Sequence, residues 1–375
     1  MSDTPVTRPP APAKGSEGLI PQTQTQPARK PGHESPYVQP KTYLRPEIRS
    51  PTMEPKSLSV LDREQMQGLK AIRDFLKVRT SYDVLPLSFR LIILNTDLLV
   101  KKSLNILLQN GIVSAPLWDS HTSTFAGLLT TSDYINVIQY YWQNPDALGQ
   151  IDQFRLSSLR DVEKAIGVSP IETLSVHPMR PLYEACRRML ESRARRIPLV
   201  DIDDETKREM VVSVVTQYRI LKFISVNVEQ TELLKKSVFE IGLGSYANLQ
   251  TASMDTPVID VIHMMVEHRI SSVPIVDENN CVLNVFEAVD VITIIKGGAY
   301  DGLDSSVGDA LSKRSDDFAG IYTCGMDDRL DTIFDTLRKS RVHRFVVVGD
   351  QNRLKGVLSL SDVLKYVLLE GEEYD

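Results

Sequence analysis

The sequence is poor in cysteine and has no long apolar run. Its 375 residues include three cysteines, which lie far apart at Cys186, Cys281 and Cys324. No CxxC pair and no metal-type Cys/His spacing appears, so we expect reduced thiols in an intracellular protein that binds no metal. No apolar stretch reaches the roughly 18 residues that a membrane helix needs, and the N-terminus lacks the charged-then-apolar order of a secretory signal. We therefore expect a protein of the cytoplasm, the nucleus or both, without membrane contact.

Positive charge is also scarce, and recognisable catalytic motifs are missing. Lysine and arginine total 43 against 49 acidic residues, which gives a formal net charge of -6. A general nucleic-acid binder is therefore not expected, and any basic site must be local. The sequence has no P-loop and no Ser-His-Asp or Cys-His order, and the isolated His121, His177 and His263 are interpreted as surface or packing residues. We expect a protein that is not an enzyme.

Proline is concentrated at the N-terminus. Twelve of the 21 prolines fall within the first 55 residues, which contain almost nothing apolar to bury. Such a segment cannot offset its ordering entropy, so residues 1–55 are predicted to be disordered. The pattern changes in "LDREQMQGLKAIRDFLKVRT", where apolar residues recur at helical spacing. This predicts an amphipathic helix at 58–80 that leads into the folded body.

The remaining sequence contains four copies of one unit. The segments "APLWD", "IPLVD", "VPIVD" and "FVVVG" place Pro116, Pro198, Pro274 and Val346 at matching positions, 82, 76 and 72 residues apart. Each segment follows an apolar stripe of helical spacing and precedes a polar turn, a second apolar strand and a second helix. We assign the four copies to residues 81–145, 165–228, 240–300 and 308–370.

Each unit reads as helix, strand, turn, strand and helix, so the predicted fold class is mixed α/β (α+β). One such unit has too few apolar faces to close a core alone. The units should therefore pair. The linkers favour copy one with copy two and copy three with copy four, each pair about a pseudo-two-fold axis.

The fourth copy, "SRVHRFVVVGDQNRLKGVLSLSD", suggests a binding cleft. Folding the unit brings the end of its first helix to the start of its second, so that His343 and Arg344 face Ser359, Ser361 and Asp362. A nucleoside monophosphate has matching needs, because its phosphate binds guanidinium groups, its ribose diol binds a carboxylate and its adenine needs an apolar slot. Such residues also serve as ordinary helix caps. Their recurrence in a fourfold repeat favours a site.

These motifs resemble a known family. The unit is similar to the cystathionine-β-synthase (CBS) domain. The motifs "SYDVLP", "SAPLWDS", "RILKF", "SSVPIVDE", "RVHRFVVV" and "LSLSDVL" resemble those of the γ regulatory subunits of AMP-activated protein kinase, best the fungal sucrose-non-fermenting type, over residues 58–370. The resemblance implies four CBS domains in a flat disc, with nucleotide sites around a central basic channel. It also implies AMP, ADP and ATP as ligands, no cofactor, and a heterotrimer with a kinase catalytic α subunit and a β scaffold subunit.

The copies differ in the acid that would hold the ribose. Copy one has Thr131 and Asp133, copy three has Asp290 and copy four has Asp362, whereas copy two has Arg219 at this position. A guanidinium group cannot accept the hydroxyl protons of a ribose. Copy two should therefore be empty, as the resemblance also implies.

The basic side of the unit varies as well. Copy two offers Arg195 and Arg196, and copy three offers Arg269 followed by Ser271 and Ser272, whereas copy one has Val113. Many sequences of the resembled family carry a channel arginine at the place of Val113, so phosphate binding at sites one and three should be weak or absent. Copy four ranks first. We expect its site to be completed by Ser245, Asn248, Ser271 and Arg314.

Two functions stay open. In the first, the chain senses AMP or ADP against ATP and regulates the catalytic subunit. In the second, it is a constitutive scaffold of the same complex with structural or vestigial nucleotide sites, an alternative that Val113 and Arg195 keep open. A third, the regulatory half of an enzyme, is weaker because this chain offers no catalytic or membrane segment to regulate.

Overall fold

The computed structural model describes residues 58–146, 153–168, 174–296, 301–315 and 318–374. The chain divides into two units, residues 1–39 and 40–375, and every described residue belongs to the second unit. The tail predicted to be disordered, residues 1–55, lies outside the described residues.

The first described helix, α2, spans Val60–Val78 within the stretch where a leading helix is expected. A capping box fixes its start, because the Ser59 side chain accepts the N–H of Asp62 at 3.0 Å and the Asp62 carboxylate accepts the N–H of Ser59. Its buried apolar face consists of Leu69, Ile72 and Leu76.

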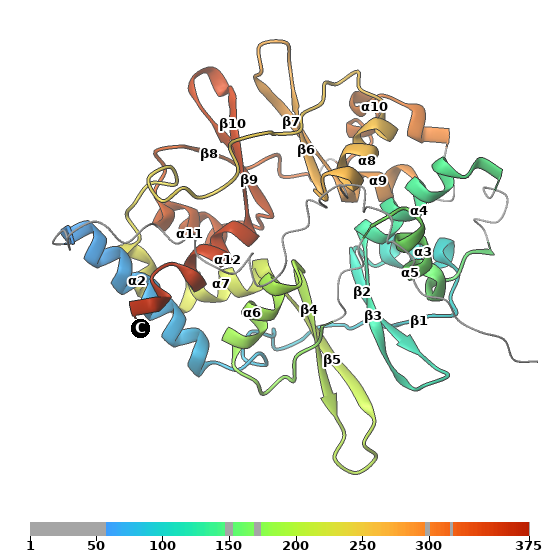
Figure 1. Ribbon diagram of the computed structural model, residues 1–375, viewed down its shortest axis with the longest axis horizontal. Helices are drawn as coiled ribbons and strands as arrows, with labels where there is room; N and C mark the ends of the chain where they lie inside the picture. The colour runs from blue at the N-terminus through green and yellow to red at the C-terminus, as the bar shows by residue number, and fades with distance from the viewer. Residues whose placement is uncertain (1–57, 147–152, 169–173, 297–300, 316–317, 375) are drawn as a thin grey trace, which may run out of the picture. The chain divides into compact units, whose positions relative to one another are not determined.

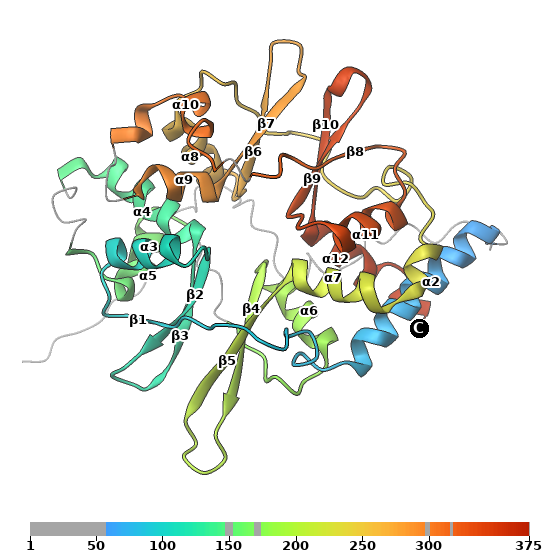
Figure 2. The ribbon, with the colours of Figure 1, turned by 180° about the vertical axis from the view of Figure 1, so that it is seen from behind.

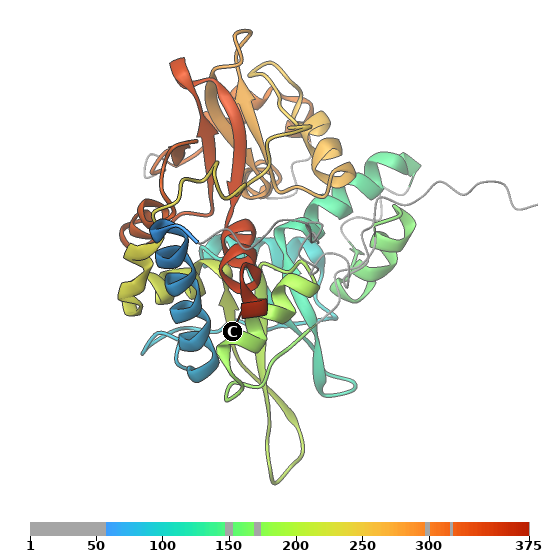
Figure 3. The same ribbon diagram turned by 60° about the vertical axis from the view of Figure 1, so that its left-hand side comes forward.

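Arg73 on this helix is fully buried and anchors the C-terminal end of the chain. Its Nη1 donates to the carbonyl oxygen of Glu370 at 2.7 Å. Glu370 is the C-cap of α12, Leu360–Leu369, so the guanidinium group satisfies a carbonyl that the helix itself leaves unpaired. Figure 3 shows α12 and the C-terminus beside α2.

The four copies follow the predicted order of elements, which confirms the mixed α/β fold (Figure 1). Copy one contains α3 (Val100–Gln109), β2 (Ser114–Asp119), β3 (Thr124–Thr130) and α4 (Thr131–Gln143). Copy two contains α6 (Leu182–Glu191), β4 (Arg196–Ile202), β5 (Glu209–Thr216) and α7 (Gln217–Asn227). Copy three contains α8 (Val258–Glu267), β6 (Ser272–Val276), β7 (Val282–Glu287) and α9 (Ala288–Ile294). Copy four contains α11 (Leu330–Lys339), β9 (Arg344–Val348), β10 (Leu354–Ser359) and α12.

Shorter helices lie in the connections between the copies. They are η2 (Leu156–Ser158), α5 (Leu159–Ala165), η3 (Glu229–Leu233), η5 (Asp301–Asp304), α10 (Val307–Leu311) and, at the β9–β10 turn and the C-terminus, η6 (Asp350–Asn352) and η7 (Glu372–Tyr374).

Every copy also has a short extended segment before its first helix, which the sequence pattern does not predict. In copy one β1 (Leu94–Asn95) runs parallel to β2, and in copy four β8 (Thr323–Gly325) runs parallel to β9. In copies two and three the equivalent segment is a single parallel bridge, at Val176 and Ala252 respectively. Segments of one to three residues carry no readable periodicity, so sequence analysis passes over them.

The two strands of each copy form an antiparallel hairpin that is irregular near its tip. The register shifts within each hairpin at Leu117/Trp118, Leu199/Val200, Ile275/Val276 and Leu354/Gly356. At the other end, next to the second helix, the ladder is regular. A β-bulge of this kind absorbs a residue on one strand without disturbing the pairing beyond it.

The hairpins associate in the expected pairs. The β3 strand of copy one contacts β5 of copy two, and the Phe125 N–H donates to Glu209 Oε2 at 2.7 Å. Between copies three and four, Cys281 bridges to Arg353, and Val282, Val285, Val346 and Leu354 form a small apolar cluster. Figures 1 and 2 show these neighbouring hairpins from opposite sides.

The helices pair differently. One apolar core joins α2 with the helices of copies two and four, and a second core joins the helices of copies one and three. Helix α7 packs against α11 and α12, and α4 packs against α8 and α9. Each unit thus has two apolar faces, one on its hairpin and one on its helices, and the two faces are covered by different neighbours.

Two general properties of the described residues bear on function. None of the described helices is long and apolar enough to cross a membrane. Within the described ranges, no group of three or more His, Cys, Asp or Glu side chains is arranged to hold a metal ion.

Candidate functional site

The hairpin register brings the two predicted halves of each cleft together. In every copy, the first residue of the first strand pairs with the residue that caps the second helix. The pairs are Ser114 with Thr130, Arg196 with Thr216, Ser272 with Glu287, and Arg344 with Ser359. The junctions that sequence analysis expected to meet do so because the ladder continues to its last residue at this end.

The acid of each copy occupies the third position of the second helix. There Asp133, Asp290 and Asp362 each accept the backbone N–H of the capping residue, at 2.6, 2.7 and 2.8 Å respectively. An acid at this position stabilises a helix start by itself. A second role in ligand binding therefore depends on whether the other carboxylate oxygen is free.

Asp362 and Asp133 each leave one carboxylate oxygen available, and Asp362 is the more accessible of the two. Its Oδ2 accepts both the N–H and the hydroxyl of Ser359, the latter at 2.6 Å, while no described residue donates a hydrogen bond to its Oδ1. Asp362 is half-buried, whereas Asp133 and Asp290 are buried. The neighbouring Ser361 hydroxyl faces copy two, where it donates to Gln217 Oε1 at 3.0 Å.

The loop that contains Ser245 and Asn248 lies against copy four. Ser245 pairs with Val357 of β10 through two backbone hydrogen bonds of 2.9 Å. The approach is so close that a Cβ on Gly356 would come within 2.7 Å of the Ser245 carbonyl oxygen. Burial, with smaller contributions from Cys324 and Asp362, raises the pKa of Tyr246, which places this ring near the copy-four acid. Asn248 is exposed, with a left-handed φ of 53°.

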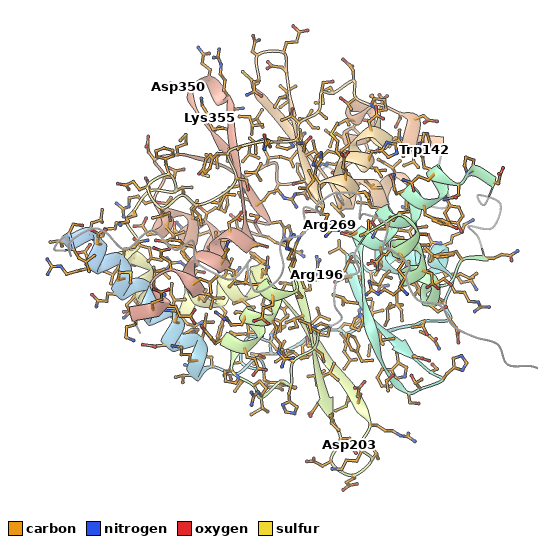
Figure 4. The ribbon with its side chains drawn as sticks, in the orientation of Figure 1. Trp142, Arg196, Asp203, Arg269, Asp350 and Lys355 are labelled. Carbon is orange, nitrogen blue, oxygen red and sulfur yellow. The ribbon has the colours of Figure 1, made fainter. Side chains whose placement is uncertain are left out.

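Basic side chains from copies two and four converge on one region, which we call the basic cluster. It consists of Arg195, Arg196, Arg219, Arg341, His343 and Arg344. The N-terminal ends of α7 and α12 meet nearby through the hydrogen bond from Ser361 to Gln217, and the Tyr218 ring at the start of α7 lies 6.1 Å from the His343 ring. Figure 4 shows Arg196 at the start of β4 and Asp203 at the far end of the same hairpin.

Mutual repulsion is evident within the basic cluster. The His343 side chain is exposed at the surface, but desolvation by the surrounding protein and the nearby guanidinium groups of Arg341, Arg344, Arg196 and Arg195 lower the pKa of His343 to about 4. The surrounding protein and the Arg344 guanidinium likewise lower the pKa of Arg195 to about 10. The arginines stay charged and His343 is neutral at pH 7, so the region attracts an anion.

Copy three holds its acid in an internal ion pair. Arg314 Nε donates to Asp290 Oδ1 at 2.7 Å and its Nη2 donates to Oδ2 at 2.5 Å, with both side chains largely buried. The guanidinium group also lies 4.2 Å from the ring centroid of Phe318. The expectation that Arg314 completes site four is therefore corrected. Arg314 follows α10, which packs against α9, so its side chain reaches copy three.

The remaining copy-three residues lie at the start of the hairpin. Ser271 accepts the Ala288 N–H through its carbonyl oxygen at 2.9 Å, and Ser272 opens β6. Arg269, exposed and labelled in Figure 4, has a left-handed φ of 52° in the turn before β6. Among the described residues, no hydrogen bond joins Ser271 to copy four, and its expected place in that site stays a prediction.

Copy one contains a hollow of about 200 Å³ beside its acid. Its lining includes Asp133, Leu117, Leu128 and Arg160. Burial, assisted by the nearby Glu163, raises the pKa of Asp133 to about 6. Thr131 opens α4 next to this acid, and Val113 adds no charge. Copy one thus offers a small hollow of mixed polar and apolar lining, in which Arg160 is the positively charged residue.

Sequence analysis missed Arg341, Glu287 and Tyr246. Arg341 occupies the repeat position of Gly111, Arg193 and Arg269, and alignment of the copies could have singled it out. Glu287 occupies a capping position that carries a hydroxyl in the other copies, which was a readable signal. Tyr246 gave no signal, because its role depends on where a linker crosses β10.

Comparisons with known proteins identify the family of the chain. The CBS domain family matches residues 165–226, 245–297 and 317–369. A protein of Saccharomyces cerevisiae named 5′-AMP-activated protein kinase subunit gamma is 60% identical over 306 residues, which cover 82% of this chain and 95% of the relative. A protein of the same name from Kluyveromyces lactis is 57% identical over 320 residues, covering 85% and 98% of the two chains.

A solved structure shows the same fold. The crystal structure of protein MJ1225 from Methanocaldococcus jannaschii superposes with a TM-score of 0.60 at 14% sequence identity. The match covers 77% of this chain and 99% of that one. At this identity the likeness concerns the fold alone.

Proposed function

Because the chain belongs to the fungal γ-subunit family of AMP-activated protein kinase, we propose that it binds adenine nucleotides and regulates a kinase catalytic subunit. The ligands are AMP, ADP and ATP, and no cofactor is needed. The partners are a catalytic α subunit and a β scaffold subunit in a heterotrimer, which acts in the cytoplasm and nucleus. Membership of the family supports the proposal of kinase-complex partners, and the proposed location rests on the sequence alone.

The observation that carries the proposal is the free oxygen of Asp362. This carboxylate is half-buried, fixed by Ser359 through Oδ2, and open through Oδ1. It can accept the hydroxyl groups of a ribose while still capping α12. The loop at Ser245 and Tyr246 borders the same place, and the Tyr246 ring can contact an adenine there.

The basic cluster supplies the complementary charge for phosphate. Arg344 pairs in register with Ser359, so its backbone lies beside the cap of the helix that carries Asp362. A charge-assisted hydrogen bond contributes about 1.5–3 kcal/mol net. Three or four such contacts, reduced by the cost of ordering the ligand, reach about -8 kcal/mol, the free energy of micromolar binding. Such an affinity suits a sensor that must exchange its ligand.

The other copies are weaker candidates for physical reasons. Copy two has Arg219 in place of the acid, and copy three has both oxygens of Asp290 paired with Arg314. Copy one keeps a hollow and an acid, but its hairpin begins with Val113 and Ser114, which carry no positive charge. We expect one strong site, at copy four.

Regulation requires that the nucleotide bind the active and inactive arrangements of the complex with different affinity. The alternative is a constitutive scaffold, and the internal pairing of copy three favours it in part, since that site is filled by the chain itself. Titration calorimetry and kinase assays on the purified complex separate the two. We expect Asp362→Ala and Arg344→Ala to reduce nucleotide binding and nucleotide-dependent kinase activity together. Unchanged kinase regulation despite lost binding would identify a scaffold.

A further inference from the structure

One copy has a carboxylate where the others have a hydroxyl. The residue that caps the second helix is Thr130 in copy one, Thr216 in copy two and Ser359 in copy four, but Glu287 in copy three. Serine and threonine are ordinary choices at a helix cap, and glutamate is not among the preferred ones. Glu287 and Asp290 still form a capping box at the start of α9, but a glutamate adds a negative charge that the serine or threonine of the other copies does not have.

Glu287 reaches across to copy four. Its Oε1 lies 3.1 Å from Arg344 Nε, and the two side chains are 24% and 15% exposed. The pairing is electrostatic, because the buried Nε–H of Arg344 has no hydrogen-bond acceptor among the described residues. An arginine held by charge with an unused donor can exchange one anion for another.

Glu287 interacts electrostatically with arginines of the basic cluster. Desolvation lowers the pKa of Arg344 and of Arg195, and the negative charge of Glu287 offsets part of that lowering at both, with help from Asp290 at Arg344. Asp290 is already paired with Arg314. Glu287 also faces the basic cluster. Among the described residues, no cation binds both of its carboxylate oxygens.

We propose that Glu287 competes with the phosphate of a bound nucleotide for Arg344, and so disfavours nucleotides in proportion to their negative charge. The inference rests on the proposed function. When a nucleotide binds, Arg344 exchanges the carboxylate for a phosphate oxygen, and Glu287 stays nearby as a negative charge. Each further phosphate meets more repulsion from Glu287, which lowers the affinity for ATP more than that for AMP. Glu287 is thus a specificity-determining residue.

The test is Glu287→Gln, which keeps the shape of the side chain and removes its charge. Titration calorimetry on the purified complex uses AMP and ATP without magnesium, so that the charge of ATP is not neutralised. We expect AMP to bind about fivefold tighter, as removal of one partly screened ion pair implies, and ATP to gain more than AMP. Both gains should shrink when the salt concentration is raised.

Two further variants serve as controls for this experiment. Glu184→Gln is the matched control, since Glu184 is also 24% exposed and paired with arginines but lies on α6 outside the basic cluster; it should leave both affinities unchanged. In an Arg344→Gln background, Glu287→Gln should gain clearly less than in the wild type. An equal gain in that background would overturn competition through Arg344.

The outcomes for the inference and for the proposed function are distinct. If the wild-type complex binds AMP and Glu287→Gln binds AMP and ATP within twofold of it, or more weakly, the inference is wrong and nucleotide binding stands. If neither protein binds any adenine nucleotide, the proposed function itself is wrong. If Glu287→Gln binds and the wild type does not, the competition is confirmed and nucleotide sensing by the natural chain is refuted.

Discussion

Replacement of Asp362 by asparagine isolates the contact between the chain and the ribose. Asparagine can keep the cap of α12 by accepting the Ser359 N–H, now 2.8 Å from the carboxylate, with its amide oxygen. It then presents an amide NH2 where Oδ1 offered a charged acceptor. Loss of one charge-assisted hydrogen bond costs about 1.5–3 kcal/mol, which corresponds to about 10- to 150-fold weaker AMP binding. The stability of the fold should change little, because the cap is retained.

The assay compares AMP with its 2′,3′-dideoxy analogue by titration calorimetry on both proteins. The wild type should prefer AMP by about the factor given above, and Asp362→Asn should bind both ligands alike. Asp309→Asn is the control, because Asp309 also accepts a hydrogen bond from a capping serine, Ser306, at 2.9 Å. A preference for AMP that survives in Asp362→Asn would refute a ribose contact at this residue.

Three further predictions concern stability and pH. Arg73→Met should lower the free energy of unfolding by about 2–3 kcal/mol, because a fully buried side chain loses its charge-assisted hydrogen bonds to the carbonyl oxygens of Val367 and Glu370. A change below about 0.5 kcal/mol in urea unfolding would contradict this. His343 has a pKa of about 4 in the folded chain against an ordinary 6.5, so the unfolded chain takes up the proton first and the free energy of unfolding falls as pH drops from 6.5 to 4. His343→Asn should reduce this fall, and an unchanged dependence of stability on pH would argue against it. The pH dependence from Asp133 has the opposite sign, because its pKa of about 6 in the folded chain exceeds the ordinary 3.8 and stability is lost as pH rises through this window. Asp133→Asn should therefore be more stable than the wild type at pH 7.5, by at most about 3 kcal/mol. This advantage, measured by thermal unfolding, should disappear near pH 4.

The local architecture was readable from the sequence because it depends on local pattern. The apolar stripe of each helix and the turn of each hairpin are encoded within about sixty residues and repeated four times. The pairing of Arg344 with Ser359 follows from hairpin geometry, so the meeting of these two junctions could be predicted from the sequence alone, whereas the binding site itself stays a prediction.

The contacts between copies could not be predicted in this way. Arg314 meets Asp290 and Arg344 meets Glu287 only because α10, α9 and the copy-four hairpin pack as they do. A repeat pattern assigns every residue to its own copy, and long side chains are not confined to one. The difference between Asp362 and the buried Asp290 is likewise a matter of neighbours, since both occupy the same position of the same motif.

The bulge divides each hairpin into an outer part that tolerates inserted residues and an inner part that does not. Residues added beyond the bulge, as in the longer copy-two tip near Asp203, lengthen a solvent-exposed turn and leave the pairing beside the second helix unchanged. A peptide tag or fluorophore could be grafted there without shifting the arginine at the strand start. A one-residue insertion on the inner side of the bulge would turn every following side chain to the opposite face of the hairpin. Related sequences should therefore vary in length at the hairpin tips and keep the length of the inner segments constant.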